Sequence, residues 1–311
     1  MKWEKKGLVF VPDGNDELMH SHASIPFATF KNANELRIYF SSRNTHGKSL
    51  PFFVDVDLKD PSKLKYVQRK PLMELGRLGT FDDSGIMPSC IVESDGSLYM
   101  YYIGWNPQIT VSYRLSIGLA ISRDGGETFL RYSIGPICDR NIDEPYFNTA
   151  PFVLKEEDTW RMWYISCTDW KIINNYPEPV YHIKYAESND GINWRREGIV
   201  CIDYDDFAEA LGRPTVFKEG DVYRMYFSYR RITDYRTNRS CSYRLGYAES
   251  KDGINWQKKN DEVDIYTSES PNDWDYQMIE YCHVLNCRDS QYMFYNGNGF
   301  GKSGFGYAKA E

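Results

Sequence analysis

Apolar and polar residues alternate along most of this chain in short runs, the period-two pattern that is typical of half-buried β-strands. One stretch shows a complete unit: an apolar run at 150–154, an aromatic run at 161–166, a third run at 182–187 and a fourth strand expected to begin at Trp194. Polar turns and loops separate these runs. Four short strands in about sixty residues match the size of one propeller blade.

The same unit recurs along the whole chain. The motif Ser-x-Asp-Gly-Ile-Asn-Trp stands at residues 188–194 and 250–256, and a variant of it spans residues 122–129. Each copy also has an apolar first strand, and most of these strands contain a proline. The first strands are expected at residues 25–28, 87–92, 150–154, 213–217 and 281–285. Five copies therefore fill the sequence, which indicates a repeat architecture.

The last copy stops after its third strand at residues 304–309, and the missing strand stands at the other end of the chain. Residues 2–10 match residues 193–201 in pattern, with Trp3 in the place of Trp194. An N-terminal strand that completes the C-terminal blade closes a ring and removes two exposed sheet edges. We therefore predict an all-β fold, a single five-bladed β-propeller domain over residues 1–311.

Composition narrows the partners and the compartment. A net charge of −7 argues against nucleic acid or an anionic membrane as the partner. The apolar run 8–11 is too short for a signal peptide, and no segment is long enough to span a membrane. Seven cysteines, an odd number without a Cys-x-x-Cys pair, indicate free thiols and a cytoplasmic protein.

The Asp-Gly turns repeat an acidic residue along the chain, but we expect them to be structural. Asp124, Asp190 and Asp252 precede glycines between third and fourth strands, where the turn requires positive φ. These turns resemble the sialidase Asp-box, which is a structural element in that family.

Candidate site residues are those near one mouth of the central channel, where first strands begin and second strands end. Near the starts of the first strands are His20, His22, Asp82, Asp83, Asn148, Glu209, Arg213, Glu280 and His283. At the ends of the second strands are Arg43, Trp105, Asp169, Arg230 and Asn296.

Two kinds of chemistry follow from these residue types. Asp83, Glu209 and Glu280 come from three blades, and glycosidic bond cleavage needs a pair of carboxyl groups. Each carboxylate could instead pair with a neighbouring arginine and only hold the channel together. The arginines suit a carboxylate or phosphate on the ligand. His20 and His22 would share one face of a strand, but no third ligand is evident, so we expect no metal and no cofactor.

The repeats also carry a family resemblance. Five blades, proline-containing first strands and the pattern Tyr-Ala-Glu-Ser-x-Asp-Gly-Ile-Asn-Trp resemble the five-bladed propeller superfamily of arabinanases, β-xylosidases, invertases, levansucrases and β-mannoside phosphorylases. Hydrolases of that superfamily place an aspartate before the first-strand proline in two blades and a glutamate near it in the third. Here the matching positions are Ile25, Met87 and Thr149–Ala150, so no catalytic assignment carries over.

The sequence thus favours a carbohydrate-active enzyme that cleaves or transfers a glycosyl unit, on an anionic, phosphorylated or nucleotide-linked sugar. Asp83 and Glu280 are the predicted acid/base or nucleophile pair, and Glu209 is expected to tune them. Tyr146 would be the nucleophile in a sialidase-like variant. The alternative is a non-catalytic propeller that binds a small sugar or oligosaccharide and has lost hydrolase activity.

Overall fold

The computed structural model describes residues 2–206, 208–287 and 290–310, and this part of the chain forms five blades, each of four antiparallel strands. The first blade contains β2 (Ser21–Asn32), β3 (Glu35–Arg43), β4 (Ser49–Asp57) and β5 (Leu64–Val67). The second contains β6 (Gly85–Ser94), β7 (Ser97–Pro107), β8 (Tyr113–Ser122) and β9 (Leu130–Arg131). The third contains β10 (Asn148–Glu156), β11 (Thr159–Ile173), β12 (Tyr176–Ser188) and β13 (Val200–Ile202).

The remaining strands form the fourth and fifth blades. The fourth contains β14 (Ala210–Glu219), β15 (Val222–Arg230), β16 (Arg244–Ser250) and β17 (Gln257–Lys258). The fifth contains β18 (Glu280–Cys287), β19 (Ser290–Asn296), β20 (Phe305–Ala310) and β1 (Trp3–Phe10). The helical segments are short: η1 (Arg239–Cys241), η2 (Asn260–Glu262) and α1 (Asn298–Gly301). In the described part of the chain, no helix is long and apolar enough to span a membrane.

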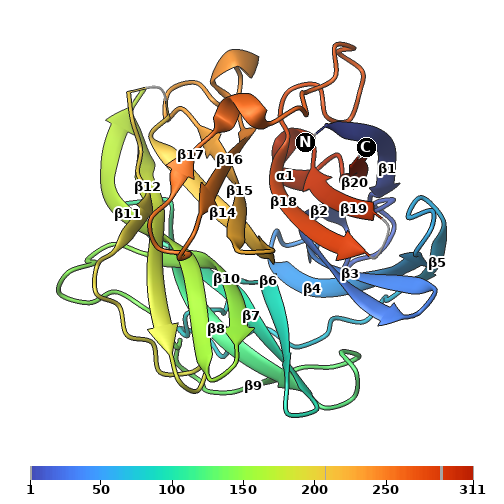
Figure 1. Cartoon of the computed structure of the whole chain (residues 1–311), viewed down its shortest axis with the longest axis horizontal. Helices are drawn as coiled ribbons and strands as arrows, with labels where there is room; N and C mark the ends of the chain where they lie inside the picture. The colour runs from blue at the N-terminus through green and yellow to red at the C-terminus, as the bar shows by residue number, and fades with distance from the viewer. Residues whose placement is uncertain (1, 207, 288–289, 311) are drawn as a thin grey trace.

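The five first strands surround the centre of the molecule (Figure 1). Each contacts the first strand of the next blade, and β18 contacts β2, so the ring is closed. Single parallel bridges join neighbouring blades at Ser49–Gly85 and Tyr181–Ala210. The predicted five-bladed propeller is confirmed.

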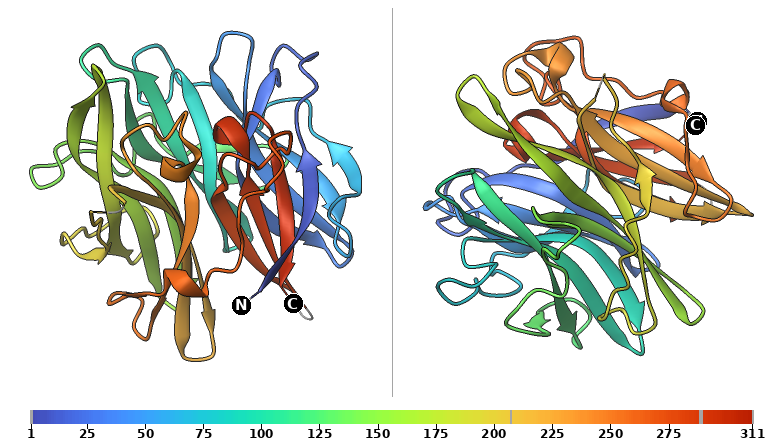
Figure 2. Two further views of the ribbon diagram at one scale, coloured as in Figure 1. Left: turned by 90° about the horizontal axis from the view of Figure 1, so that it is seen from above. Right: turned by 90° about the vertical axis from the view of Figure 1, so that its left-hand side faces the viewer.

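The N-terminal strand completes the last blade, as predicted. β1 pairs antiparallel with β20, with Trp3 opposite Ala310 and Phe10 opposite Phe305, and the two ends of the chain lie side by side (Figure 2). Trp3 is buried and packs edge-on against Tyr226 of the fourth blade, with ring centroids 5.9 Å apart. Its indole nitrogen donates a hydrogen bond of 3.3 Å to the Tyr226 hydroxyl. Trp3 therefore links the closing strand to the neighbouring blade.

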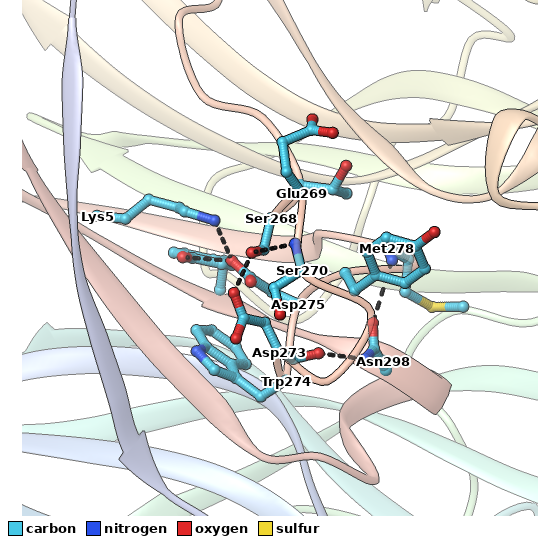
Figure 3. Close-up of polar contacts among 12 residues, drawn as sticks. Lys5, Ser268, Glu269, Ser270, Asp273, Trp274, Asp275, Met278 and Asn298 are labelled. Atoms are coloured by element: carbon cyan, nitrogen blue, oxygen red, sulfur yellow. Dashed lines mark hydrogen bonds and ion pairs between the residues drawn. The ribbon is translucent and has the colours of Figure 1, made fainter.

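A second contact secures this closure from the loop that precedes β18 (Figure 3). The Lys5 ammonium lies 2.7 Å from the buried Asp275 carboxylate, and the Tyr295 hydroxyl donates to the same carboxylate at 3.1 Å. The Trp274 ring stacks on Tyr295 with centroids 5.1 Å apart. Because this loop runs directly into β18, the closure also fixes the entry of the strand that carries Glu280.

The Asp-Gly turns at Asp190 and Asp252 bind the third and fourth blades to the blade that precedes each of them. The Asp190 carboxylate accepts hydrogen bonds of 2.8 Å from the backbone nitrogens of Ile192 and Asn193. The carbonyl of Gly191 accepts a bond of 2.8 Å from the Tyr101 hydroxyl of the second blade. In the same way, the carbonyl of Gly253 accepts a bond of 2.8 Å from the Trp163 indole of the third blade.

The fourth strand of the third blade begins later than expected. It starts at Val200 rather than at Trp194. The Trp194 ring instead packs edge-on against Tyr101 of the second blade, with centroids 6.0 Å apart. Trp194 therefore packs between two blades, and the outer strand begins further along the chain.

Candidate functional site

A cavity of about 500 Å³ occupies the channel mouth. The first strand of every blade contributes to its lining, at Ile25, Met87, Ala150, Arg213 and Tyr281. The rest of the lining is mainly aromatic and basic, including Trp105, Tyr113, Phe147, Tyr176, Tyr181, Tyr235, Tyr243, Phe300, Arg43, Arg230 and Arg236.

A β-bulge places four of these five first-strand residues at the cavity. The register between first and second strands shifts across Ile25, Ala150, Arg213 and Tyr281, whereas in the second blade Met87 is paired with Ile103 and the shift lies between Pro88 and Cys90. Positive φ angles accompany the shift at Ile25 (57°), Ala150 (46°), Arg213 (54°) and Tyr281 (53°). Non-glycine residues seldom adopt this conformation, and such strain clusters at functional sites. A proline follows Ile25, Ala150 and Arg213, and because it has no N–H, the bulge leaves no donor unpaired there.

The positions that carry acids in the resembling hydrolases hold no acid in this cavity, where Thr149 is their one polar residue. Ile25, Met87 and Ala150 face the cavity from the first three blades. Within the described ranges, the cavity lining contains neither aspartate nor glutamate. The chemistry of the mouth is therefore dominated by guanidinium groups and phenols.

Arg213 is the most buried charged group of the lining, with 1% of its surface exposed. Its two terminal nitrogens donate long bonds to backbone carbonyls, to Cys282 at 3.4 Å and to Pro26 at 3.2 Å. Its Nε has no hydrogen-bond partner, and no described carboxylate forms an ion pair with it. Burial lowers the pKa of Arg213 to about 10, so the group stays charged at neutral pH.

Arg230 is also buried, with 2% of its surface exposed, and it is enclosed by aromatic rings. Its guanidinium lies 3.7 Å from the centre of the Tyr235 ring, and its Nε donates to the Tyr243 hydroxyl at 3.1 Å. Tyr243 in turn shares a 2.7 Å hydrogen bond with Tyr181. These contacts fix the orientation of the guanidinium, but none of them supplies a negative charge.

The two other arginines lie in different surroundings. Arg43, at the end of β3, is exposed at the rim of the cavity. Arg236 is paired with the buried carboxylate of Glu178, which also accepts a bond of 3.0 Å from Tyr235. The charge of Arg236 is therefore already balanced, in contrast to that of Arg213 and Arg230.

Glu280 lies directly behind the lining, since it precedes Tyr281 in β18 and is fully buried. Neither carboxyl oxygen has a hydrogen-bond partner of good geometry among the described residues. Burial raises the pKa of Glu280 well above its usual range, although the nearby Tyr281 phenol and the Arg230 charge act in the opposite direction. Burial thus shifts the pKa of Glu280 in the direction that favours the protonated, neutral carboxyl group.

The other predicted catalytic acids lie outside the lining. Asp83 accepts bonds from the Gly79 backbone nitrogen at 2.8 Å and the Ser84 hydroxyl at 2.9 Å. Glu209 accepts a bond of 3.2 Å from the backbone nitrogen of Ile232. Both carboxylates thus bind neighbouring loop residues, and neither lines the cavity.

Three further predicted polar residues are engaged in buried networks. Asp82 forms an ion pair with Arg131 at 2.7 Å. Asn148 accepts a bond of 2.7 Å from Arg196. Asn296 joins the fifth blade to the first, because its side-chain oxygen accepts a bond of 2.7 Å from the Ile25 backbone nitrogen.

The histidines and Asp169 also lie outside the lining. His20 is exposed, and Asp169 accepts a bond of 2.8 Å from the backbone nitrogen of Trp170. Burial, together with the charges of Arg43 and Lys302, lowers the pKa of His22 to about 4. His283 is buried in the channel, where burial lowers its pKa well below the usual range.

Of the predicted site residues, the structure brings Arg43, Trp105, Arg213 and Arg230 together around one cavity. The sequence analysis missed Arg236 and all the tyrosines of the lining, and Tyr146, the tyrosine that it named, does not line the cavity. The signal that could have found Tyr281 is its position, which matches Arg213 in the preceding repeat. Among the side chains that the structure describes, no group of three or more histidines, cysteines or acids is arranged to hold a metal ion.

The chain has relatives along its full length. It is 34% identical over 314 residues to "Uncharacterized protein MT1551" and to "Uncharacterized protein Rv1502", both from Mycobacterium tuberculosis, and the match covers 100% of each sequence. No known protein-family profile matches it.

Solved structures share its fold at low sequence identity. A complex of BT0996 with RGII has a TM-score of 0.73 at 19% identity, covering 99% of this chain and 90% of the other. A glycosyl hydrolase from Bacteroides ovatus has a TM-score of 0.72 at 14% identity, covering 99% and 93%. A protein of the GH130 family of mannoside phosphorylases has a TM-score of 0.69 at 15% identity, covering 100% and 94%. The chain thus belongs to one family with the two Mycobacterium tuberculosis proteins, and its fold is that of the five-bladed propeller glycoside hydrolases.

Proposed function

We propose that the protein is a carbohydrate-active propeller whose cavity binds a sugar that carries a carboxylate or phosphate group. One observation carries this proposal: Arg213 and Arg230 are buried at the cavity, and neither forms an ion pair with a carboxylate among the described residues. A buried guanidinium without a counter-charge is costly, and an anionic ligand group offsets that cost through charge-assisted hydrogen bonds. The fold shared with glycoside hydrolases supports a carbohydrate as the rest of the ligand.

The size and walls of the cavity are consistent with a sugar. A volume of about 500 Å³ lies within the range of small-molecule sites. Trp105, Tyr113 and Phe147 supply aromatic surface for the apolar face of a sugar ring, while the lining hydroxyls and guanidinium groups can bind its polar edge.

We further propose that the bound sugar is cleaved or transferred, with Glu280 as the proton donor to the leaving oxygen. Burial raises its pKa, which favours the protonated state that a general acid needs. Because Glu280 is fully buried behind the lining, its side chain would have to turn into the cavity to reach the leaving oxygen. Attack on the anomeric carbon requires a second group. For Asp83 to be that group, it would have to leave its bonds to Gly79 and Ser84.

A second candidate function is binding without cleavage. The observation that favours it is the absence of carboxylates from the described lining, with Ile25 and Met87 at the positions of the hydrolase acids. Both candidates share the anionic sugar and differ only in the chemical step.

The test of the ligand class is a thermal-shift series with glucuronic acid, galacturonic acid and glucose 6-phosphate, each compared with its neutral parent sugar. Selective binding to the folded state raises the melting temperature. We expect an acidic sugar to stabilise the protein and its neutral parent to have no effect. Equal shifts for acidic and neutral sugars, or no shift with any acidic sugar, would contradict the proposal.

Cleavage and simple binding are then separated by prolonged incubation with glycosides of the acidic sugar that binds. Cleavage predicts product from the wild-type protein and a rate about 10²–10⁴-fold lower in Glu280→Gln, because the amide cannot donate the acid proton. Binding without product over the whole incubation supports the second candidate.

A further inference from the structure

We propose that the cavity is blind and admits only the end of a glycan, with the acidic group of the terminal sugar entering first. This inference rests on the proposed function, since it states how the acidic sugar is presented to the site.

A layer of buried side chains, one from each first strand, closes the channel below the cavity without lining it. Each stands two positions after the first-strand residue that lines the cavity, further along the strand from the mouth. These floor residues are Phe27, Ser89, Phe152, Thr215 and His283, and none is more than 5% exposed. A layer contributed by all five blades therefore lies one step deeper in the channel than the lining.

Contacts across the channel axis hold this layer together. The rings of Phe27 and His283 lie 4.0 Å apart, and Phe152 lies 6.2 Å from each of them. The Ser89 hydroxyl donates a bond of 2.8 Å to the carbonyl of Pro151. These contacts join the first, second, third and fifth blades, so the channel is packed with side chains below the cavity.

Arg213 marks the deep end of the cavity. The carbonyls that bind its guanidinium belong to Pro26 and Cys282, and each of these residues stands between a lining residue and a floor residue. Arg43, by contrast, is exposed at the rim. The buried positive charge without an acidic partner is therefore at the floor, which favours entry of the anionic group ahead of the rest of the ligand.

A closed floor also restricts which sugar of a glycan can reach Arg213. An internal sugar has glycosidic bonds on both sides, and one of its neighbours would have to occupy the space filled by Phe27 and Phe152. A terminal sugar has a neighbour on one side only, and that neighbour extends through the mouth past Tyr176 and Arg236.

The experiment is a calorimetric titration of the wild-type protein with probes built on glucuronic acid. The probes are the free sugar, a trisaccharide with the uronate at one end, and a trisaccharide of the same composition with the uronate in the middle. We expect the end-uronate trisaccharide to bind within about tenfold of the free sugar, and the middle-uronate trisaccharide to bind at least about 100-fold more weakly. The end-uronate trisaccharide is tested in two versions, one with the uronate at the non-reducing end and one with it at the reducing end. Tight binding of either version supports the inference.

The outcomes separate the inference from the function on which it rests. Equal affinity for end and middle uronates would overturn the blind cavity and leave the anionic-sugar proposal intact. If free glucuronic acid binds no better than glucose and the other acidic sugars behave alike, the proposed function itself fails.

Discussion

Arg213 shows how a single backbone conformation determines what the site can recognise. Its positive φ turns the side chain toward the channel, and the following proline removes a donor that the bulge would leave unpaired. The sequence analysis placed this residue at the channel mouth because it stands at the start of a first strand, and in the structure it lines the cavity. The sequence could not show that Asp83, in the loop just before a first strand, would bind its own loop instead, since spacing along the chain does not specify which neighbouring donors a carboxylate will bind.

Replacing Arg213 separates ligand binding from stability. In Arg213→Met, an unpaired buried charge becomes an apolar group of similar length, so we expect the free energy of unfolding to stay within about 1 kcal/mol of wild type or to rise. Loss of the anion contact should weaken binding of an acidic sugar by about 2–5 kcal/mol, about 30-fold or more.

The matched control is Arg140→Met, which changes an exposed arginine outside the cavity lining and should leave binding unchanged. Urea denaturation and calorimetric titration give the two quantities. Unaltered affinity in Arg213→Met would remove this residue from the site.

Glu280 predicts a pH dependence of stability with a definite sign. Its pKa is raised in the folded protein, so the native state holds a proton that the unfolded chain releases above about pH 4.5. Stability from this group is therefore complete below that pH and is lost as the pH rises toward the folded pKa, with a slope of at most about 1.4 kcal/mol per pH unit.

The comparison is between wild type and Glu280→Gln, which cannot ionise. Denaturant titrations from pH 4 to pH 9 should show the variant gaining stability over wild type as the pH increases. A constant difference across this range would mean that Glu280 is ionised in the folded protein.

At the scale of the element, the Asp-Gly turn explains why the repeats can be recognised from the sequence. The turn carries its own hydrogen bonds, and its glycine carbonyl binds an aromatic side chain of the preceding blade. A local motif therefore encodes a contact between blades, and the fold could be predicted from it. The start of the fourth strand of the third blade could not be predicted in this way. Trp194 packs against Tyr101, a residue 93 positions earlier in the chain, rather than continuing the local pattern.

Asp190→Ala should test this structural role. The variant loses the acceptor for two backbone nitrogens in the turn, and we expect a loss of about 1–2 kcal/mol in the free energy of unfolding. Binding of the acidic sugar should be unchanged, because the turn does not line the cavity. Asp190→Asn, which keeps one side-chain oxygen, serves as the milder control, and a loss of binding with intact stability in Asp190→Ala would contradict the structural role.

At the scale of the whole molecule, closure of the ring depends on a strand from the opposite end of the chain. β1 pairs with β20, and Trp3 carries the contact to the fourth blade. The matching sequence pattern made this pairing predictable. The contact between Lys5 and Asp275 could not be predicted, since neither residue belongs to a repeated motif.

Trp3→Ala removes a large buried ring from this closure, and we expect it to cost about 3–5 kcal/mol of stability. Trp3→Phe keeps an aromatic ring and loses only the bond to the Tyr226 hydroxyl, so it should cost much less. Thermal and urea unfolding measure both variants. Wild-type stability in Trp3→Ala would show that the ring does not depend on this strand.

The central claim is that two buried arginines receive the acid group of a sugar at the closed end of the channel. A crystal structure with the most stabilising acidic sugar tests it most directly. We predict that the carboxylate or phosphate lies about 2.7–2.9 Å from nitrogens of Arg213 and Arg230, with the ring toward Trp105 and the linkage position facing the mouth. A sugar bound with its acid group toward solvent, or bound outside this cavity, would contradict the account.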